Sequence, residues 1–175
     1  MEKVIEEDPN ALELLNLCSF LAPDRIPEKL LSAYLSSKRH STGLDFQDAL
    51  RLLESYSLID QKVEHKDNTY QKWISIHRLI QMVTRDQCKP TEAKEIIMLG
   101  IDVLGDQLEG NVRTKQEREV AKSLVVHGKS LIVHADEQSI HSIKKLHVTE
   151  SIGVFLLRAG ILNEAKELFK KKYGH

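Results

Sequence analysis

The chain has 175 residues, and its 41% hydrophobic content is enough to bury the core of one or two small domains. Its 25 Lys and Arg residues balance 26 Asp and Glu, so net charge favours neither a nucleic-acid nor a membrane partner. The two cysteines, Cys18 and Cys88, offer neither a disulfide framework nor a metal knuckle, and we expect Cys18 to be a buried thiol. No apolar run approaches the roughly 20 residues of a membrane span, and the acidic start is unlike a signal peptide, so we expect a cytoplasmic protein.

Three helices are expected before residue 57. Asp8 can cap a helix that begins at Pro9 and ends near Pro23, since proline lacks the N–H donor that would be unsatisfied there. Pro27 opens a second helix at 28–36, and a third runs from residue 44 or 45 to 56. The spacing predicts that each buries one apolar side, formed by Leu30, Leu31, Tyr34 and Leu35 in the second helix and by Phe46, Ala49, Leu50, Leu52 and Leu53 in the third.

Two short segments rich in branched and aromatic residues, 57–63 and 70–76, predict a small β-hairpin around a polar turn. Because two strands alone are marginally stable, the hairpin must lie on the neighbouring helices. A fourth helix, 77–87, follows, and Pro90 closes a first domain at 1–90. In this helix we expect buried side chains at Leu79, Ile80 and Val83 and exposed ones at Arg78, Gln81, Arg85 and Asp86.

Every segment beyond Pro90 has a helical pattern. Thr91 is expected to cap a helix that breaks at 109–111, and the capping-box pattern at 114–117 opens another helix that runs to about residue 135. A third helix begins near Asp136 and reaches Gly160, and a fourth covers 162–173. Short loops between such helices predict antiparallel helical hairpins, so we expect a mainly α protein.

Three blocks of the first domain resemble a known arrangement. They are LLNLCSFLAPDRIPEKLL at 14–31, ALRLLESYSLI at 49–59 and IHRLIQ at 76–81. In this order they resemble the winged-helix region that follows the ATPase core in NB-ARC-type (STAND) signal-transduction ATPases that carry tetratricopeptide repeats. The resemblance covers residues 10–88 and implies that 1–90 is a winged-helix domain.

The end of the chain carries a second resemblance. Small and apolar residues fall at the spacings of a tetratricopeptide repeat (TPR), with a glycine at the turn, namely Ile152, Gly153, Leu156, Gly160, Ala165 and Phe169. Lys172 departs from the pattern, which usually has alanine there. The resemblance implies a helical bridge at 91–145 and a truncated TPR-like repeat at 146–175. One repeat cannot bury its own face, so we expect further repeats in a longer parent chain.

His77 is the candidate site residue. In the resembling ATPases a Met-His-Asp type motif opens the equivalent segment, and its histidine contacts the phosphates of bound ADP. Ile76-His77-Arg78 lies there with Arg78 in place of aspartate, so the resemblance implies a phosphate contact that also requires a nucleotide-binding domain. The alternative, that His77 only caps or packs the start of the helix, stays open. The sequence has no Gly-x-x-x-x-Gly-Lys-Ser/Thr loop, so we expect no cofactor of its own and ADP or ATP only in the parent protein.

No residue pattern indicates catalysis or a metal site. His127, His134 and His141 recur every seven residues, but they complete no known ligand spacing. We therefore expect neither a catalytic residue nor a bound metal, and we expect the protein not to be an enzyme.

The resemblance implies a non-catalytic segment of a signalling ATPase that relays between a nucleotide-binding domain and a repeat sensor arm. Its expected partners are those domains and a protein or peptide ligand. One alternative is a winged-helix DNA-binding regulator, but residues 1–90 carry 12 Lys and Arg against 14 Asp and Glu, which disfavours nucleic acid. Another is a TPR-like scaffold that binds peptides in grooves after Pro90.

Overall fold

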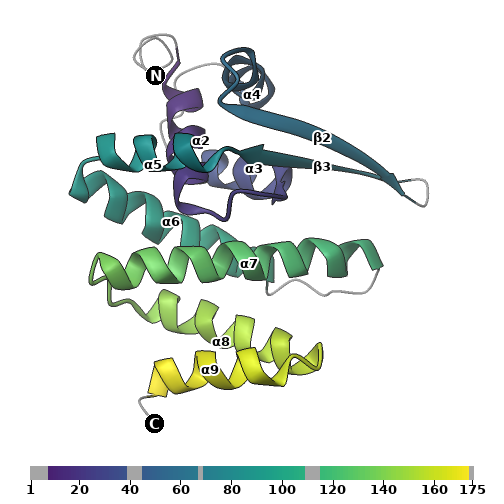
Figure 1. Cartoon of the computed structure of the whole chain (residues 1–175), viewed down its shortest axis with the longest axis vertical. Helices are drawn as coiled ribbons and strands as arrows, with labels where there is room; N and C mark the ends of the chain where they lie inside the picture. Colours follow the sequence, from purple (N-terminus) through teal and green to yellow (C-terminus); the bar gives the residue numbers. More distant parts are fainter. Residues whose placement is uncertain (1–7, 39–44, 67–68, 109–114, 174–175) are drawn as a thin grey trace.

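The computed structural model describes residues 8–38, 45–66, 69–108 and 115–173 (Figure 1). In these residues the fold is mainly helical with one small antiparallel sheet, as the sequence predicts. The elements in chain order are α2 (Pro9–Phe20), β1 (Ile26–Pro27), α3 (Glu28–Ser37), α4 (Phe46–Ser55), β2 (Ile59–Lys66), β3 (Thr69–Ile76), α5 (Arg78–Gln87), α6 (Pro90–Leu108), α7 (Lys115–Glu137), α8 (Ile143–Arg158) and α9 (Leu162–Tyr173). Helices α2 to α5 and the sheet form one end of the molecule, and α6 to α9 follow as a stack in which consecutive helices run in opposite directions (Figure 1).

The first three described helices begin at or within two residues of the expected starts. The Asp8 carboxylate accepts a hydrogen bond of 2.7 Å from the N–H of Ala11, and Pro27 immediately precedes α3. The Asp45 carboxylate caps α4 by accepting from the N–H of Asp48. The predicted apolar side of α3 is wholly buried, whereas in α4 only Ala49, Leu50 and Leu53 are fully buried and Phe46 and Leu52 are partly so.

The sheet has a third strand that the sequence pattern does not reveal. The predicted hairpin is present, and its register runs from Ile59 opposite Ile76 out to Lys66 opposite Thr69. The two-residue strand β1 pairs with the other edge of β3 and gives the order β1-β3-β2. Ile59, Ile74 and Ile76 bury the base of the hairpin on the helices, while its outer half extends away from them (Figure 1).

Helix α5 is rotated about its axis relative to the prediction. Gln81 was expected to be exposed but is 5% exposed, and Leu79 was expected to be buried but is 55% exposed. Ile80 and Val83 are partly buried. The physical reason lies in α2, because the Gln81 side chain donates to backbone carbonyls at the end of that helix, as described below. A buried carbonyl without a donor costs more than one exposed leucine.

Two predicted boundaries in the second half are wrong. Helix α6 begins at Pro90, so Thr91 lies inside its first turn and is not the cap. Helix α7 continues through Glu137, and α8 begins only after Ser142, whose hydroxyl accepts from the N–H of Lys145. The turn between them passes through Ser139 in a left-handed conformation, which ends α7 where the sequence offered Asp136 as a helix start. Thr114 of the predicted capping box lies outside the described residues, and α9 has the predicted bounds.

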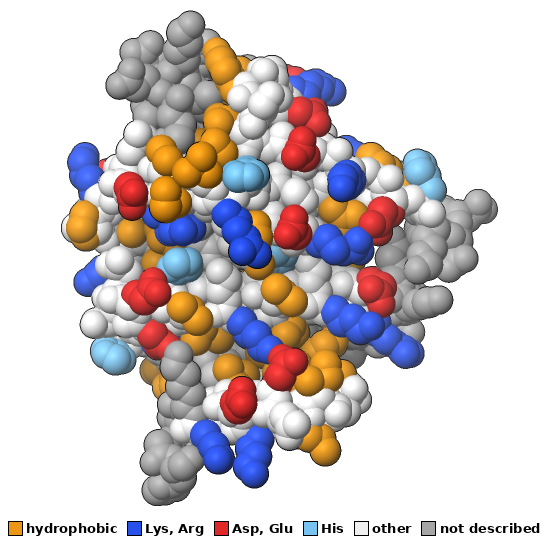
Figure 2. Space-filling view, viewed as in Figure 1, with side chains coloured by type: hydrophobic (Ala, Val, Ile, Leu, Met, Phe, Trp, Pro, Cys, Tyr) orange, Lys and Arg blue, Asp and Glu red, His pale blue; other side chains and the backbone are white. Residues whose placement is uncertain are grey.

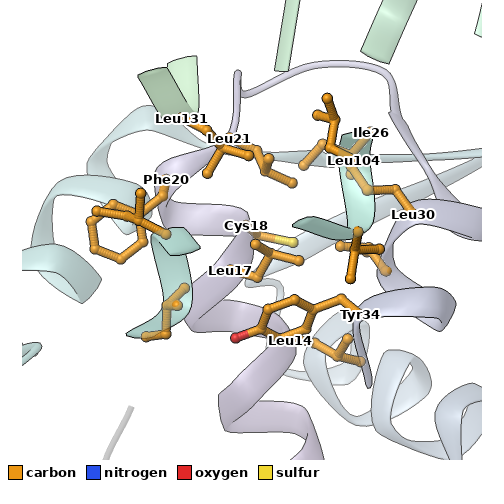
Figure 3. Close-up of a cluster of buried hydrophobic side chains, with 14 of the residues drawn as sticks. Leu14, Leu17, Cys18, Phe20, Leu21, Ile26, Leu30, Tyr34, Leu104 and Leu131 are labelled. Atoms are coloured by element: carbon orange, nitrogen blue, oxygen red, sulfur yellow. The ribbon is translucent and has the colours of Figure 1, made fainter. Parts of the chain in front are cut away.

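One continuous hydrophobic core joins the two ends of the molecule. It begins in α2, where Leu14, Leu17 and Cys18 are completely buried (Figure 3), and it continues without a break to Ala165 in α9. Burial raises the pKa of the Cys18 thiol to about 12, as expected for a buried structural cysteine. Within the described ranges, no helix is both long and apolar enough to cross a membrane.

Candidate functional site

The C-terminal end of α2 is a junction at which three helices meet. The last turn of a helix leaves carbonyl groups without partners, and this turn has no glycine to close them. Gln81 of α5 donates through its side-chain amide to the carbonyls of Cys18 (2.9 Å) and Leu21 (2.8 Å). Arg85, one turn further along α5, donates to the carbonyl of Ser19. Side chains of α5 therefore complete the end of a helix about 60 residues earlier in the chain.

Helix α7 contributes the other side of this junction through three polar residues on one face. Ser130 donates to the carbonyl of Phe20 at 2.9 Å, and both Ser123 (2.5 Å) and His127 (3.0 Å) contact the carbonyl of Arg25. The three residues are spaced four and three positions apart, so they lie on one side of the helix. This face fastens α7 to the chain segment between α2 and α3.

His127 is fully buried at this contact. Burial lowers the pKa of its imidazole to about 4, so the ring is neutral at pH 7. The neutral ring binds the Arg25 carbonyl through Nε2, which must then carry the proton, and its buried Nδ1 has no hydrogen-bond partner. His127 thus serves as a hydrogen-bond donor in the junction.

His77 lies at the N-terminus of α5, at the rim of the same end of the molecule. Its Nδ1 accepts a hydrogen bond of 3.2 Å from the N–H of Leu79, so in the neutral ring Nε2 carries the proton. The side chain is exposed, and this proton is directed away from its own cap contact. Within this chain His77 therefore caps α5, as the second alternative expects, and its ring is exposed to solvent.

Next to His77, α5 presents an apolar surface to solvent. Leu79 is 55% and Met82 48% exposed, and Arg78 and Asp86 flank them. We call these five residues, His77 included, the outer face of α5. Figure 2 shows hydrophobic side chains gathered over α5 on the face of the molecule in view. An exposed apolar surface rimmed by charges is typical of a contact with another protein surface.

The predicted TPR-like positions meet one another in the α8–α9 hairpin. A Cβ atom at Gly153 would lie 2.3 Å from the ring of Phe169, so only glycine permits this contact. Leu156 and Ala165 are buried, and Gly160 ends α8 with a φ of 76°. The N–H groups of Gly160 and Ile161 bond back to Leu157 and Leu156, which closes the helix end within its own backbone.

A shallow groove of about 170 Å³ lies between α6 and α8. Its polar lining includes Asp102 and Asp106 from α6 and Lys144, His147 and Ser151 from α8. Asp102 and Lys144 form an ion pair across it. The two helices approach closely because Gly105 faces Val148, where a Cβ would lie 2.8 Å from the valine methyl group.

The three histidines at seven-residue spacing do not come together. His127 is in the junction, His134 bonds to Glu137 and lies edge-on to the ring of Phe20, and His141 is exposed in the turn before α8. Across the described residues, no group of three or more His, Cys, Asp or Glu side chains is arranged to hold a metal ion.

Several basic side chains between residues 8 and 89 are paired with acidic ones. In α4, Arg51 pairs with Asp48, and Lys72 of the hairpin pairs with Glu28. Figure 2 shows positive and negative side chains interspersed over the face in view. A face that binds duplex DNA carries clustered Lys and Arg side chains, and the face in view has mixed charges instead.

Sequence reasoning missed the junction residues. Gln81 and Arg85 were assigned to the exposed side of α5, and Ser123 and Ser130 were not singled out. A signal did exist in α7, where Ser123, His127 and Ser130 interrupt an otherwise apolar side at helical spacing. Polar residues so placed indicate a buried partner, but not which carbonyl they bind.

Comparison with known proteins places part of this chain in a family. No curated protein and no solved structure shows significant similarity to it. Residues 3–93, which include α2 to α5 and the first residues of α6, match the family described as Domain of unknown function (DUF7779). Because this match covers just over half of the sequence, the chain belongs to that family.

Proposed function

We propose that the chain is a non-catalytic relay module of an NB-ARC-type (STAND) signalling ATPase. In this proposal α2 to α5 with the sheet form a winged-helix domain, and α6 to α9 are a helical bridge and the first TPR-like hairpin of a sensor arm. The element order of helices, hairpin and helix, together with the Gly153–Phe169 contact, supports this assignment.

The junction at the end of α2 carries the proposal. A relay must move as one body, and here the α7 face of Ser123, His127 and Ser130 is hydrogen-bonded to backbone carbonyls of the first domain. The continuous core adds apolar packing across the same boundary. A displacement of the helical stack would therefore carry α2 and α5 with it.

The outer face of α5 is the proposed contact with the nucleotide-binding domain. Leu79 and Met82 supply apolar area, and the exposed Nε2 of His77 can donate to a phosphate oxygen of ADP. Release of this face when the sensor arm binds its ligand would free the nucleotide.

The test uses the coding sequence around this segment. The proposal expects an upstream Gly-x-x-x-x-Gly-Lys-Ser/Thr loop and downstream repeats, and a protein that spans all three should retain ADP. Met82→Asp should speed ADP release about tenfold because it places a charge in the interface. Met98→Asp on α6 is the matched control, since Met98 is 46% exposed and Met82 48%. Equal effects of the two substitutions, or the lack of an upstream phosphate-binding loop, would overturn the proposal.

A second test uses the chain by itself. It should show no ATP turnover, and a rate that a substitution within this chain abolishes would contradict the non-catalytic role.

The groove between α6 and α8 favours a second function, a scaffold that binds a peptide. Its mixed charges, from Asp102, Asp106 and Lys144, could pair with a peptide of either sign. A peptide ligand whose binding is lost on Asp106→Ala but unchanged by Met82→Asp would favour the scaffold over the relay.

A further inference from the structure

Arg25 contacts both the hairpin and α7, and it does so in a left-handed backbone conformation. Its φ is 56°, a value that residues other than glycine seldom adopt. The residue lies between α2 and β1, in the connection that leads from the first helix into the sheet. A conformation of this kind persists only where surrounding contacts hold it.

The side chain of Arg25 holds the hairpin. Its guanidinium stacks 4.2 Å from the centre of the Trp73 ring and forms a two-pronged ion pair with Glu64, with distances of 2.6 and 3.2 Å. The indole N–H of Trp73 donates to the same carboxylate at 3.0 Å. Strand β2 therefore contributes Glu64 and strand β3 contributes Trp73 to one cluster. Lysine could not reproduce it, because only a planar guanidinium both stacks and binds a carboxylate with two N–H groups.

The backbone of Arg25 holds α7. Its carbonyl oxygen contacts the Ser123 hydroxyl and the His127 Nε2. These are two of the three side-chain hydrogen bonds that fasten α7 to the chain before α3. The direction of the carbonyl depends on the left-handed conformation, so the contacts on the two sides of Arg25 are not independent.

We propose that Arg25 is a positioning residue that couples the β2–β3 hairpin to helix α7. A partner group that competes for the Arg25–Glu64 pair, whose side chains are 49% and 50% exposed, would free the guanidinium. The backbone of Arg25 would then relax from its left-handed conformation and turn the carbonyl away from Ser123 and His127. A partner that binds at the hairpin would thus weaken the contacts between α7 and the junction at the end of α2. This inference deepens the proposed function, but its test needs only the chain itself, so the coupling can hold or fail whatever the parent protein does.

The test is a double-mutant cycle between the two sides of Arg25. Glu64→Gln weakens the hairpin side, and Ser123→Ala weakens the α7 side. The unfolding equilibrium constant is measured in urea for each single variant and for the pair. If Arg25 couples the two sides, the combined effect should differ at least about threefold from the product of the single effects. In an Arg25→Gly background, the combined effect on the unfolding equilibrium constant should equal the product of the two single effects. Glycine keeps the backbone conformation but has no side chain to hold the hairpin.

Trp73 gives an independent reading, since it is the single tryptophan of the chain. Ser123→Ala should shift the fluorescence of Trp73 in the folded protein, although the Ser123 hydroxyl contacts the Arg25 carbonyl and the His127 ring and not Trp73 itself. Arg25→Gly also relieves the strain of a non-glycine residue in a left-handed conformation. Ser139→Gly is the control for that effect alone, because Ser139 has a φ of 53° in the distant α7–α8 turn. Should Arg25→Gly fail to fold, Arg25→Asn takes its place, since asparagine tolerates this conformation. Independent effects of Glu64→Gln and Ser123→Ala in the wild-type background, or coupling that survives loss of the Arg25 side chain, would overturn the inference.

Discussion

At the end of α2, the carbonyls of Cys18, Ser19, Phe20 and Leu21 receive their hydrogen bonds from side chains of α5 and α7, whereas α8 closes its own end through the backbone around Gly160. The first arrangement requires three helices to be present at once. The second needs only the local sequence, and it leaves α8 and α9 to be held together by packing. The junction is therefore a cooperative network, whereas the α8–α9 hairpin is a set of separable contacts.

The network should be most sensitive at Gln81. Gln81→Leu keeps the approximate size of the side chain but leaves two buried carbonyls without donors, at about 4 kcal/mol of unfolding free energy in total. Urea unfolding followed by circular dichroism measures this loss. Gln87→Leu, at an exposed position of the same helix, is the control and should change stability by less than about 0.5 kcal/mol. A loss at Gln81 as small as at Gln87 would show that the α2 carbonyls find water instead.

His127 should make the junction sensitive to acid. Its pKa falls from 6.5 in the unfolded chain to about 4 in the folded protein, so the unfolded state binds more protons between these values. The contribution of His127 is fully present above pH 6.5 and declines as pH falls towards 4, by about 3 kcal/mol over the whole window. His127→Gln should remove this part of the pH dependence of unfolding. A difference in unfolding free energy between wild type and His127→Gln that does not change with pH would refute the assignment.

The stability of the α8–α9 hairpin should depend on how closely its side chains pack and not on buried hydrogen bonds. Gly153→Ala places a methyl group against the Phe169 ring and should lower the unfolding free energy by about 2 kcal/mol. Thermal unfolding measures the change. Phe169→Leu should be less harmful in the Gly153→Ala background than in the wild type, since it makes room for the methyl group. Two losses that simply add would mean that the ring already lies elsewhere in solution.

Helix caps give the smallest effects and test whether the two regions unfold together. Asp8→Ala in the first region and Ser142→Ala in the second each remove a side-chain acceptor at a helix start, at about 1 kcal/mol apiece. If the continuous core makes the molecule one cooperative unit, each variant lowers a single shared transition. If the two regions unfold separately, calorimetry should show two transitions, and each substitution should lower the temperature of only one of them.

What the sequence could predict follows the same division. The helix starts expected at Pro9 and Glu28 depend on Asp8, Pro9 and Pro27, which are close in sequence, and both starts are confirmed. The third helix begins at Phe46, one or two residues after the expected position. The Gly153 and Phe169 spacing likewise depends on two neighbouring helices, and the structure brings the two residues together.

The prediction failed where a distant partner decides. The hydrophobic pattern of α5 placed Leu79 inside, but the carbonyls of α2 required Gln81 there. The miss at Asp136 is a local one: α7 continues past Asp136, the chain then turns through Ser139, and the Ser142 hydroxyl accepts from the N–H of Lys145. The strand β1 is two residues long, too short to have a pattern at all, and depends wholly on β3. The junction was missed for this reason, since every one of its hydrogen bonds joins separate elements.

Pro27 ends β1 and precedes α3, so β1 pairs with β3 at only two positions, Ile26 with Ile74 and Pro27 with Trp73. Proline has no N–H to offer, and the chain turns into a helix immediately afterwards. A strand from a second molecule that approached β1 itself would find only these two residues to pair with. The same proline that precedes α3 therefore also limits strand addition at β1.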